Sequence, residues 1–210
     1  MMKTVLCYGD SNTWGYEPKT DGRIPWKQRW PGILQDKLGA DFQVVENGLC
    51  GRTTRHESAT EAFVNGYLEA RVCAEVNAPL SVAAVMLGTN DCKDEYTSEP
   101  ADIAENVKAV AKVFQEKGAK ILILSPAPIR ELEKSPFRDE FGRYAEEKSR
   151  RLPGYLRKMA DEMGWTFLET GKFVKAGDYD GIHLPAEEHA KLAEAVAKKI
   201  EELSRDIEQK

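Results

Sequence analysis

Residues 5–12 read Val5-Leu6-Cys7-Tyr8-Gly9-Asp10-Ser11-Asn12, an unbroken apolar run that ends in a glycine followed by three small polar side chains. Such a run is typical of a strand that is buried on both faces of a parallel sheet. Comparable apolar runs recur at residues 42–45, 81–87, 120–124 and 166–168. The sequence therefore predicts a central parallel sheet of about five strands.

Amphipathic segments with clear ends lie between these predicted strands. Pro31 suits the first turn of a helix that ends at Gly39, and Pro100 suits the first turn of another helix that ends at Gly118. The alternation of strand and helix implies right-handed crossovers and a three-layer α/β/α sandwich, and we expect residues 1–210 to form a single domain. Apolar side chains at helical spacing mark the second of these helices and the last helix: Ile103, Val107, Val110 and Phe114, and Leu192, Val196, Ile200 and Leu203.

The composition is that of an ordinary soluble protein. The 210 residues are 41% hydrophobic and 31% charged, which suffices for one well-filled core. The formal net charge of -5 argues against nucleic acid or an anionic membrane as a partner, because those surfaces select basic patches. No apolar run approaches the roughly 20 residues of a membrane helix. Residues 1–8 lack the apolar core of a signal peptide, so the cytoplasm is the expected location.

Three residues supply the parts of a nucleophilic centre. Ser11 follows the first predicted strand, and Asp180 and His183 lie close together near the C-terminus. A serine hydroxyl needs a base to take its proton, and an imidazole serves as that base when an acceptor holds its other nitrogen. Because Asp180 precedes His183 by three residues, one turn of chain can bring its carboxylate to the imidazole. Only Ser11 must be brought to them by the fold.

Residues that follow the predicted strands also supply candidate donors for an oxyanion. Ser11, Gly51 and Asn90 follow the first, second and third strands, whose carboxyl ends meet at one edge of the sheet. The tetrahedral intermediate of acyl transfer needs hydrogen-bond donors that are already in place. The backbone N–H groups of Ser11 and Gly51 and the side-chain amide of Asn90 fit this requirement.

Four sequence blocks resemble those of the SGNH hydrolases, also called GDSL esterases: Gly9-Asp10-Ser11, Gly51, Gly88-Thr89-Asn90-Asp91 and Asp180-Gly181-Ile182-His183. The resemblance covers nearly the whole chain and implies a flavodoxin-like α/β/α fold with no metal. It makes Ser11 the nucleophile, His183 the base and Asp180 its orienting carboxylate, with Ser11, Gly51 and Asn90 as the oxyanion hole. The context of these blocks is most similar to the bacterial arylesterase and acyltransferase branch, whose members favour short acyl groups and often form oligomers. A homo-oligomer is therefore expected.

Side chains next to Ser11 are candidates for the substrate pocket. Asn12 stands where the family's name implies leucine, which leaves the substrate preference open. Trp14 and Tyr16 are predicted to line the pocket, and residues 126–153 are predicted to form its opposite rim. Asp10 is predicted to support the turn structurally rather than to take part in the chemistry.

The remaining histidines and cysteines predict no further site. His56 and His189 have no second histidine three or four residues away, so metal-ligand spacing is absent and no cofactor is expected. The cysteines show no Cys-x-x-Cys spacing, which favours reduced thiols. Cys50 and Cys92 are interpreted as small buried side chains.

Together these features predict a serine esterase that acts on a small-molecule ester with a short acyl chain, through an acyl-enzyme that water or another alcohol resolves. Three alternatives stay open: a carbohydrate acetylesterase, a thioesterase or lysophospholipase, and a non-catalytic binding module. Each motif alone has a structural explanation, since Gly-Asp-Ser often marks a turn and Asn90-Asp91 could cap the following segment. The order of the four blocks along the chain favours catalysis.

Overall fold

The computed structural model describes residues 2–208 and contains a five-stranded parallel sheet in the order β4-β1-β5-β6-β7. This confirms the predicted parallel sheet. The strands are β1 (Lys3–Gly9), β4 (Phe42–Gly48), β5 (Val82–Met86), β6 (Lys120–Ser125) and β7 (Thr166–Glu169).

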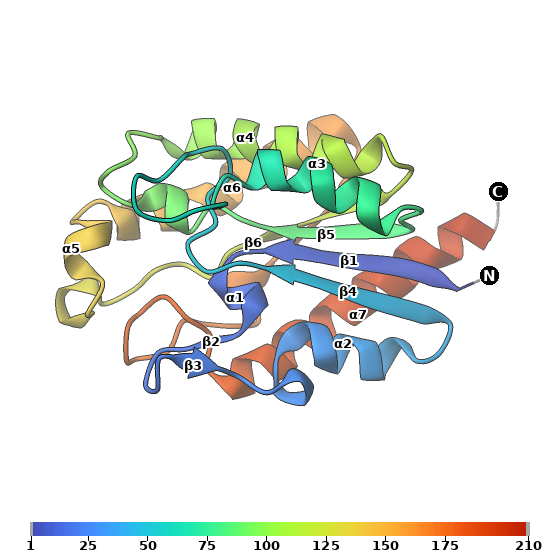
Figure 1. The fold of residues 1–210 in the computed structure, drawn as a ribbon, viewed down its shortest axis with the longest axis horizontal. Coiled ribbons are helices and arrows are strands. Elements are labelled where there is room, and N and C mark those ends of the chain that lie inside the picture. The colour runs from blue at the N-terminus through green and yellow to red at the C-terminus, as the bar shows by residue number, and fades with distance from the viewer. Residues whose placement is uncertain (1, 209–210) are drawn as a thin grey trace.

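Long helices cover both faces of this sheet (Figure 1). One face carries α3 (Gly66–Asn77), α4 (Pro100–Gln115) and α6 (Ala145–Met163), and the other carries α2 (Trp30–Leu38) and α7 (Ala186–Glu208). Alternate strand residues enter separate hydrophobic cores, so that Leu6 and Tyr8 pack with the first group of helices, whereas Val5 and Cys7 pack with the second. The predicted three-layer α/β/α sandwich is thus confirmed.

Local sequence explains where several of these helices begin and end. Pro100 lies in the first turn of α4, and Glu99 and Asp102 form a reciprocal capping box there. The helix ends at Gln115, before the predicted stop at Gly118. Pro153, at the end of the segment 126–153 that is predicted to form a rim, lies inside α6. Buried apolar side chains of α6, Leu152 and Leu156 among them, hold this helix against the core despite the N–H that Pro153 lacks.

The register brings the polar strand ends together. Gly9, the last residue of β1, pairs with Gly48 of β4 and with Met86 of β5, so these three strands end at one level. Four short elements lie beyond this edge, toward the left in Figure 1 and away from the two termini: α1 (Ser11–Trp14), β2 (Tyr16–Glu17), β3 (Gly22–Arg23) and α5 (Arg138–Phe141). The chain also forms the 3-10 turns η1 (Trp26–Gln28), η2 (Asn90–Cys92), η3 (Leu132–Lys134) and η4 (Thr170–Lys172).

Within residues 2–208, none of the helices combines the length and the apolar character that crossing a membrane requires.

Candidate active site

Ser11, His183 and Asp180 form one continuous chain of hydrogen bonds. Ser11 Oγ lies 2.8 Å from His183 Nε2, and His183 Nδ1 lies 2.6 Å from Asp180 Oδ2. The three residues keep only 6%, 8% and 1% of their surface exposed, respectively. The fold therefore brings a hydroxyl from one end of the chain to an imidazole and a carboxylate from the other.

A sharp turn at the end of β1 presents Ser11. Asp10 caps α1, since its Oδ1 accepts a hydrogen bond from the Asn12 N–H at 3.0 Å. A Cβ at Gly9 would lie 2.1 Å from the Thr13 hydroxyl oxygen, so this tight entry into α1 requires glycine. Burial raises the pKa of Asp10 to about 6. The cap supports the structural role predicted for Asp10.

Asp180 organises the histidine loop through both of its oxygens. While Oδ2 faces the imidazole, Oδ1 accepts the backbone N–H groups of Ile182 at 2.9 Å and His183 at 3.0 Å. Burial by itself would raise the pKa of Asp180, but these hydrogen bonds and the imidazole hold it below its ordinary value. An ionised Asp180 accepts from Nδ1–H, which leaves Nε2 of His183 free to accept the Ser11 proton.

The three predicted oxyanion donors surround the same space. Gly51 adopts a left-handed backbone conformation with φ of 77°. Asn90 Nδ2 donates one hydrogen bond to the carbonyl of Arg52 at 3.0 Å and has a second N–H to offer. The backbone N–H groups of Ser11 and Gly51 donate no hydrogen bond to any group within residues 2–208. These donors are therefore available to a ligand.

Two buried charged residues that the sequence analysis missed hold the oxyanion loops in place. Arg52 donates to the carbonyl oxygens of Gly9 at 2.8 Å and Asn47 at 2.6 Å, which fixes the Gly51 loop on the ends of β1 and β4. Asp91 accepts hydrogen bonds from the backbone N–H and the hydroxyl of Thr54. Burial raises the pKa of Asp91, and these hydrogen bonds oppose that rise. In the sequence each residue is a charge beside a predicted donor, and Asp91 also belongs to the block Gly88-Thr89-Asn90-Asp91.

A cavity of about 160 Å³ opens in front of Ser11. The rings of Tyr16 and Phe137 form one wall, with centroids 4.6 and 5.8 Å from that of the His183 imidazole. The complete lining is Ser11, Tyr16, Cys50, Gly51, Glu61, Asn90, Lys93, Phe137, Glu140, Phe141, Ile182 and His183.

Two residues predicted for the pocket lie elsewhere. Asn12 links α1 to the histidine loop, because its Oδ1 accepts the Leu184 N–H at 2.8 Å and its Nδ2 donates to the Ile182 carbonyl at 3.3 Å. The ring of Trp14 packs under the guanidinium of Arg23, 4.6 Å from its centroid. Neither belongs to the lining of the cavity, whereas Tyr16 does.

The cysteines interpreted as buried packing residues differ in their placement. Cys92 is buried, but Cys50 is exposed and lines the cavity. Partial desolvation of the sulfur by the cavity wall, together with the charge of Asp10, raises the pKa of the Cys50 thiol to about 11, which makes it a weak nucleophile at neutral pH.

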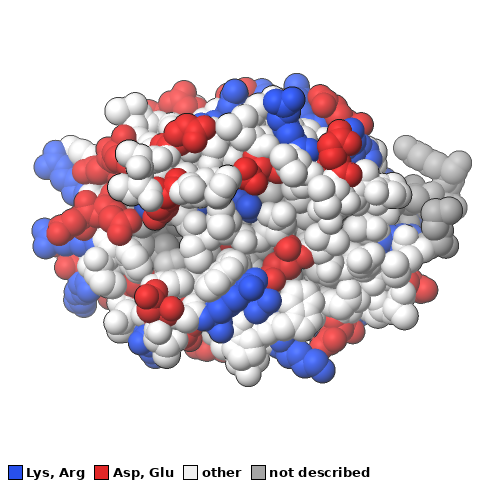
Figure 2. Space-filling model, in the orientation of Figure 1, with Lys and Arg blue, Asp and Glu red and all other residues white. Residues whose placement is uncertain are grey.

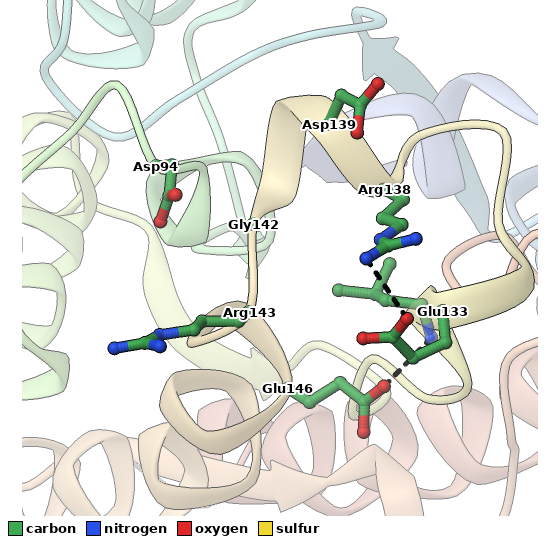
Figure 3. Close-up of a pocket in the computed structure, with 8 residues that line it drawn as sticks. Asp94, Glu133, Arg138, Asp139, Gly142, Arg143 and Glu146 are labelled. Carbon is green, nitrogen blue, oxygen red and sulfur yellow. Dashed lines mark hydrogen bonds and ion pairs between the residues drawn. The ribbon is translucent and has the colours of Figure 1, made fainter.

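A second cavity of about 350 Å³ lies between η3, α5 and the start of α6, and Figure 3 shows its lining. Glu133 and Arg138 form an ion pair of 3.3 Å there, and Glu146 accepts the Leu132 N–H at 2.8 Å. The lining contains no serine, cysteine or histidine, so this larger cavity lacks a nucleophile and base. Within residues 2–208, no group of three or more His, Cys, Asp or Glu side chains is placed to hold a metal ion.

The parallel sheet and the residues at its carboxyl edge define a serine ester hydrolase of the SGNH type. The chain belongs to the GDSL-like lipase/acylhydrolase family, whose model matches residues 7–191. Among curated protein sequences, no relative matches the chain.

Solved structures of esterases share this fold over almost their whole length. Est24, a carbohydrate acetylesterase from Sinorhizobium meliloti, is 32% identical with a TM-score of 0.91, and the match covers 96% of this chain and 99% of that one. The aryl esterase of M. smegmatis is also 32% identical with a TM-score of 0.91, and the match covers 96% of this chain and 99% of that one. A putative arylesterase from Agrobacterium tumefaciens is 32% identical with a TM-score of 0.88, covering 96% of this chain and 100% of that chain.

Proposed function

We propose that the protein hydrolyses short-chain acyl esters through an acyl-enzyme on Ser11, within a single domain. The hydrogen-bonded chain from Ser11 through His183 to Asp180 carries this proposal, because it opens directly into the cavity that holds the candidate oxyanion donors. The aryl esterase among the similar structures supports an aryl or alkyl ester as the substrate.

The mechanism follows from the positions of these groups. His183 Nε2 takes the proton of Ser11 as its Oγ attacks the carbonyl carbon, and Asp180 stabilises the resulting imidazolium. The oxyanion accepts hydrogen bonds from the N–H groups of Ser11 and Gly51 and from Asn90 Nδ2. His183 then protonates the departing alkoxide, which leaves an ester on Ser11. Water, or a second alcohol in acyl transfer, gives a proton to His183 and attacks that ester to release the acyl group.

The small cavity favours a short acyl chain. Its aromatic wall of Tyr16 and Phe137 packs against the catalytic imidazole, so a long chain has little room beside the reacting carbon. This argues against a lysophospholipase. A carbohydrate acetylesterase is the second candidate, because it also transfers a short acyl group and because such an enzyme from Sinorhizobium meliloti shares the fold.

Initial rates on p-nitrophenyl esters from acetate to octanoate test the proposal. Ser11→Ala should lower kcat by at least about 1000-fold, since removing a triad member leaves only the oxyanion hole and binding. Ser204→Ala removes an equally buried hydroxyl from α7, outside the cavity, and should keep the wild-type rate. Equal activity of wild type and Ser11→Ala would refute the role of Ser11. Higher activity on acetylated oligosaccharides than on aryl acetates would favour the carbohydrate esterase.

We also propose that the chain associates with a second copy through α3. Leu68, Val72 and Val76 form an outward apolar stripe on this helix and are 47%, 61% and 75% exposed. In an antiparallel pairing about a two-fold axis near Val72, Leu68 meets Val76 of the second copy. Arg71 and Glu75 lie on the same flank of the stripe, so Arg71 approaches Glu75 of the second copy, a carboxylate that also pairs with Lys117 of its own chain. The surface is therefore self-complementary in both apolar character and charge.

A further inference from the structure

The mouth of the active-site cavity carries one charge that the protein leaves unbalanced. Lys93 and Glu140 of the lining form an ion pair of 3.1 Å, so their charges offset each other. Glu61, the third charged residue of the lining, is exposed and forms no ion pair with any residue between 2 and 208. A net negative charge therefore remains at the entrance. In Figure 2, acidic side chains gather over the left end of the molecule, where this edge of the sheet lies, with basic side chains mostly at its margin.

The carboxylate of Glu61 lies against the Cα of Gly51, whose backbone N–H is a candidate oxyanion donor. A Cβ built on Gly51 would be 2.2 Å from Glu61 Oε2, which places this oxygen over the Cα of Gly51. The Glu61 N–H donates to the Ser58 hydroxyl at 3.2 Å, which holds the backbone of this loop. The negative charge also acts on the neighbouring thiol: burial and Asp10 raise the pKa of Cys50, Arg23 opposes that rise, and Glu61 adds to it.

This position has a consequence for the reaction. Negative charge develops on the substrate oxygen next to the Gly51 N–H in the transition state, close to the negative charge of Glu61. Like charges at this distance repel, and the repulsion is strong where water is partly excluded. A substrate that brings a positive charge to Glu61 removes that repulsion, whereas a substrate that brings a negative charge increases it. The effect grows as the oxyanion forms, so it acts on kcat as well as on KM.

We propose that Glu61 makes the enzyme selective for esters that carry a cationic group and against esters that carry an anion. The aromatic wall of Tyr16 and Phe137 suits this class of substrate, because aromatic faces attract quaternary ammonium groups. Glu61 is a specificity-determining residue in this scheme and takes no proton. The inference rests on the proposed ester hydrolysis at Ser11.

The test compares three acetate esters that differ in charge: 2-(trimethylammonio)ethyl acetate, its uncharged analogue of the same shape, 3,3-dimethylbutyl acetate, and 2-sulfoethyl acetate. Values of kcat and KM are measured for wild type, Glu61→Gln and Glu57→Gln. Glu57 is an exposed glutamate of the same loop that does not line the cavity, so its variant is a matched control. Taking the ratio of variant to wild type for each ester cancels the intrinsic reactivity of the leaving groups.

In Glu61→Gln, the ratio of kcat/KM for the cationic ester to that for the uncharged ester should fall by about 3- to 10-fold. The ratio of kcat/KM for the sulfonate ester to that for the uncharged ester should rise by a similar factor. The control should keep both wild-type ratios. If Glu61→Gln changes both ratios by less than twofold, the inference is overturned. If the variant misfolds, the same rates are measured on wild type at low and at high salt. The preference of wild type for the cationic ester should decline as the salt concentration rises, and a salt-independent preference would refute the role of Glu61. Failure to hydrolyse even the uncharged ester would instead refute the proposed function.

Discussion

Replacing Asn12 by alanine should loosen the link between the nucleophile and the base. Asn12 is 4% exposed, follows Ser11 in α1, and hydrogen-bonds the backbone on both sides of His183. Its Oδ1 accepts from the Leu184 N–H at 2.8 Å, and its Nδ2 donates to the Ile182 carbonyl at 3.3 Å. This side chain therefore sets the position of the histidine loop relative to α1.

The size of the effect follows from these contacts. Alanine leaves a buried N–H and a buried carbonyl without their partners, and an unsatisfied buried group costs about 1–3 kcal/mol. The bond to Leu184 dominates because the bond to Ile182 is long, so we expect a loss of about 2–4 kcal/mol in the free energy of unfolding. The Ser11–His183 hydrogen bond of 2.8 Å should lengthen as well. A displacement of about 1 Å in a catalytic site can lower the rate ~100-fold, so kcat should fall by about 10- to 100-fold with little change in KM.

Urea unfolding and steady-state kinetics on p-nitrophenyl acetate measure the two effects separately. Asn77→Ala is the control, since the Asn77 side chain at the end of α3 bonds only Cys73 among residues 2–208, donating to its carbonyl at 2.8 Å and to its sulfur at 3.6 Å, and lies outside the cavity. It should cost about 1 kcal/mol and leave kcat unchanged. If Asn12→Ala is no less stable than Asn77→Ala, the bridge contributes nothing to stability. If it is less stable but keeps the wild-type kcat, the bridge does not position His183.

Four further outcomes are expected. Phe137→Ala opens the aromatic wall of the cavity and should shift the best p-nitrophenyl ester from acetate toward longer acyl chains; an unchanged profile would contradict the assigned wall. Burial raises the pKa of Asp10 from 3.8 to about 6, so the free energy of unfolding of wild type falls as the pH rises through this window. Urea titrations should therefore show the free energy of unfolding of Asp10→Asn increasing relative to that of wild type by about 1 kcal/mol per pH unit. Burial lowers the pKa of His189 from 6.5 to about 4, so the contribution of His189 to the free energy of unfolding declines as the pH falls through that window. The same urea titrations should show no such decline in His189→Gln. Leu68→Glu combined with Val76→Glu should reduce the mass measured by light scattering to one chain, and a wild-type mass of one chain would refute the α3 pairing.

The features that the sequence predicted correctly are determined by residues that lie close together along the chain. Continuous apolar runs such as residues 81–87 have few alternatives to a buried strand, and parallel pairing then brings the residues after each strand to one edge. Asp180 and His183 are also local partners, separated by a single turn of chain. For these residues the spacing alone predicted which groups the structure brings together.

Asn12 was misplaced because its partners are distant in sequence. A polar side chain beside a nucleophile is compatible with a pocket wall, and only the fold brings Ile182 and Leu184, 170 and 172 residues away, to its two ends. Cys50 was misjudged for a related reason, since a small side chain next to a turn fits a packed interior or a cavity wall equally well. Sequence spacing contains no information that separates these alternatives.

The residues that sequence analysis missed share a physical role in the site. Arg52 and Asp91 are charged and almost completely buried, a placement that hydrogen bonds must offset, although Arg52 Nε has no partner within residues 2–208. Arg52 donates to backbone carbonyl oxygens at the ends of β1 and β4, and Asp91 accepts the backbone N–H of Thr54. Preorganised donors accelerate a reaction only if they do not move as charge develops, so the loops that hold them must be rigid. Buried charges bonded to the loop backbone supply that rigidity, so Arg52 and Asp91 matter to the proposed chemistry although neither touches the reacting atoms.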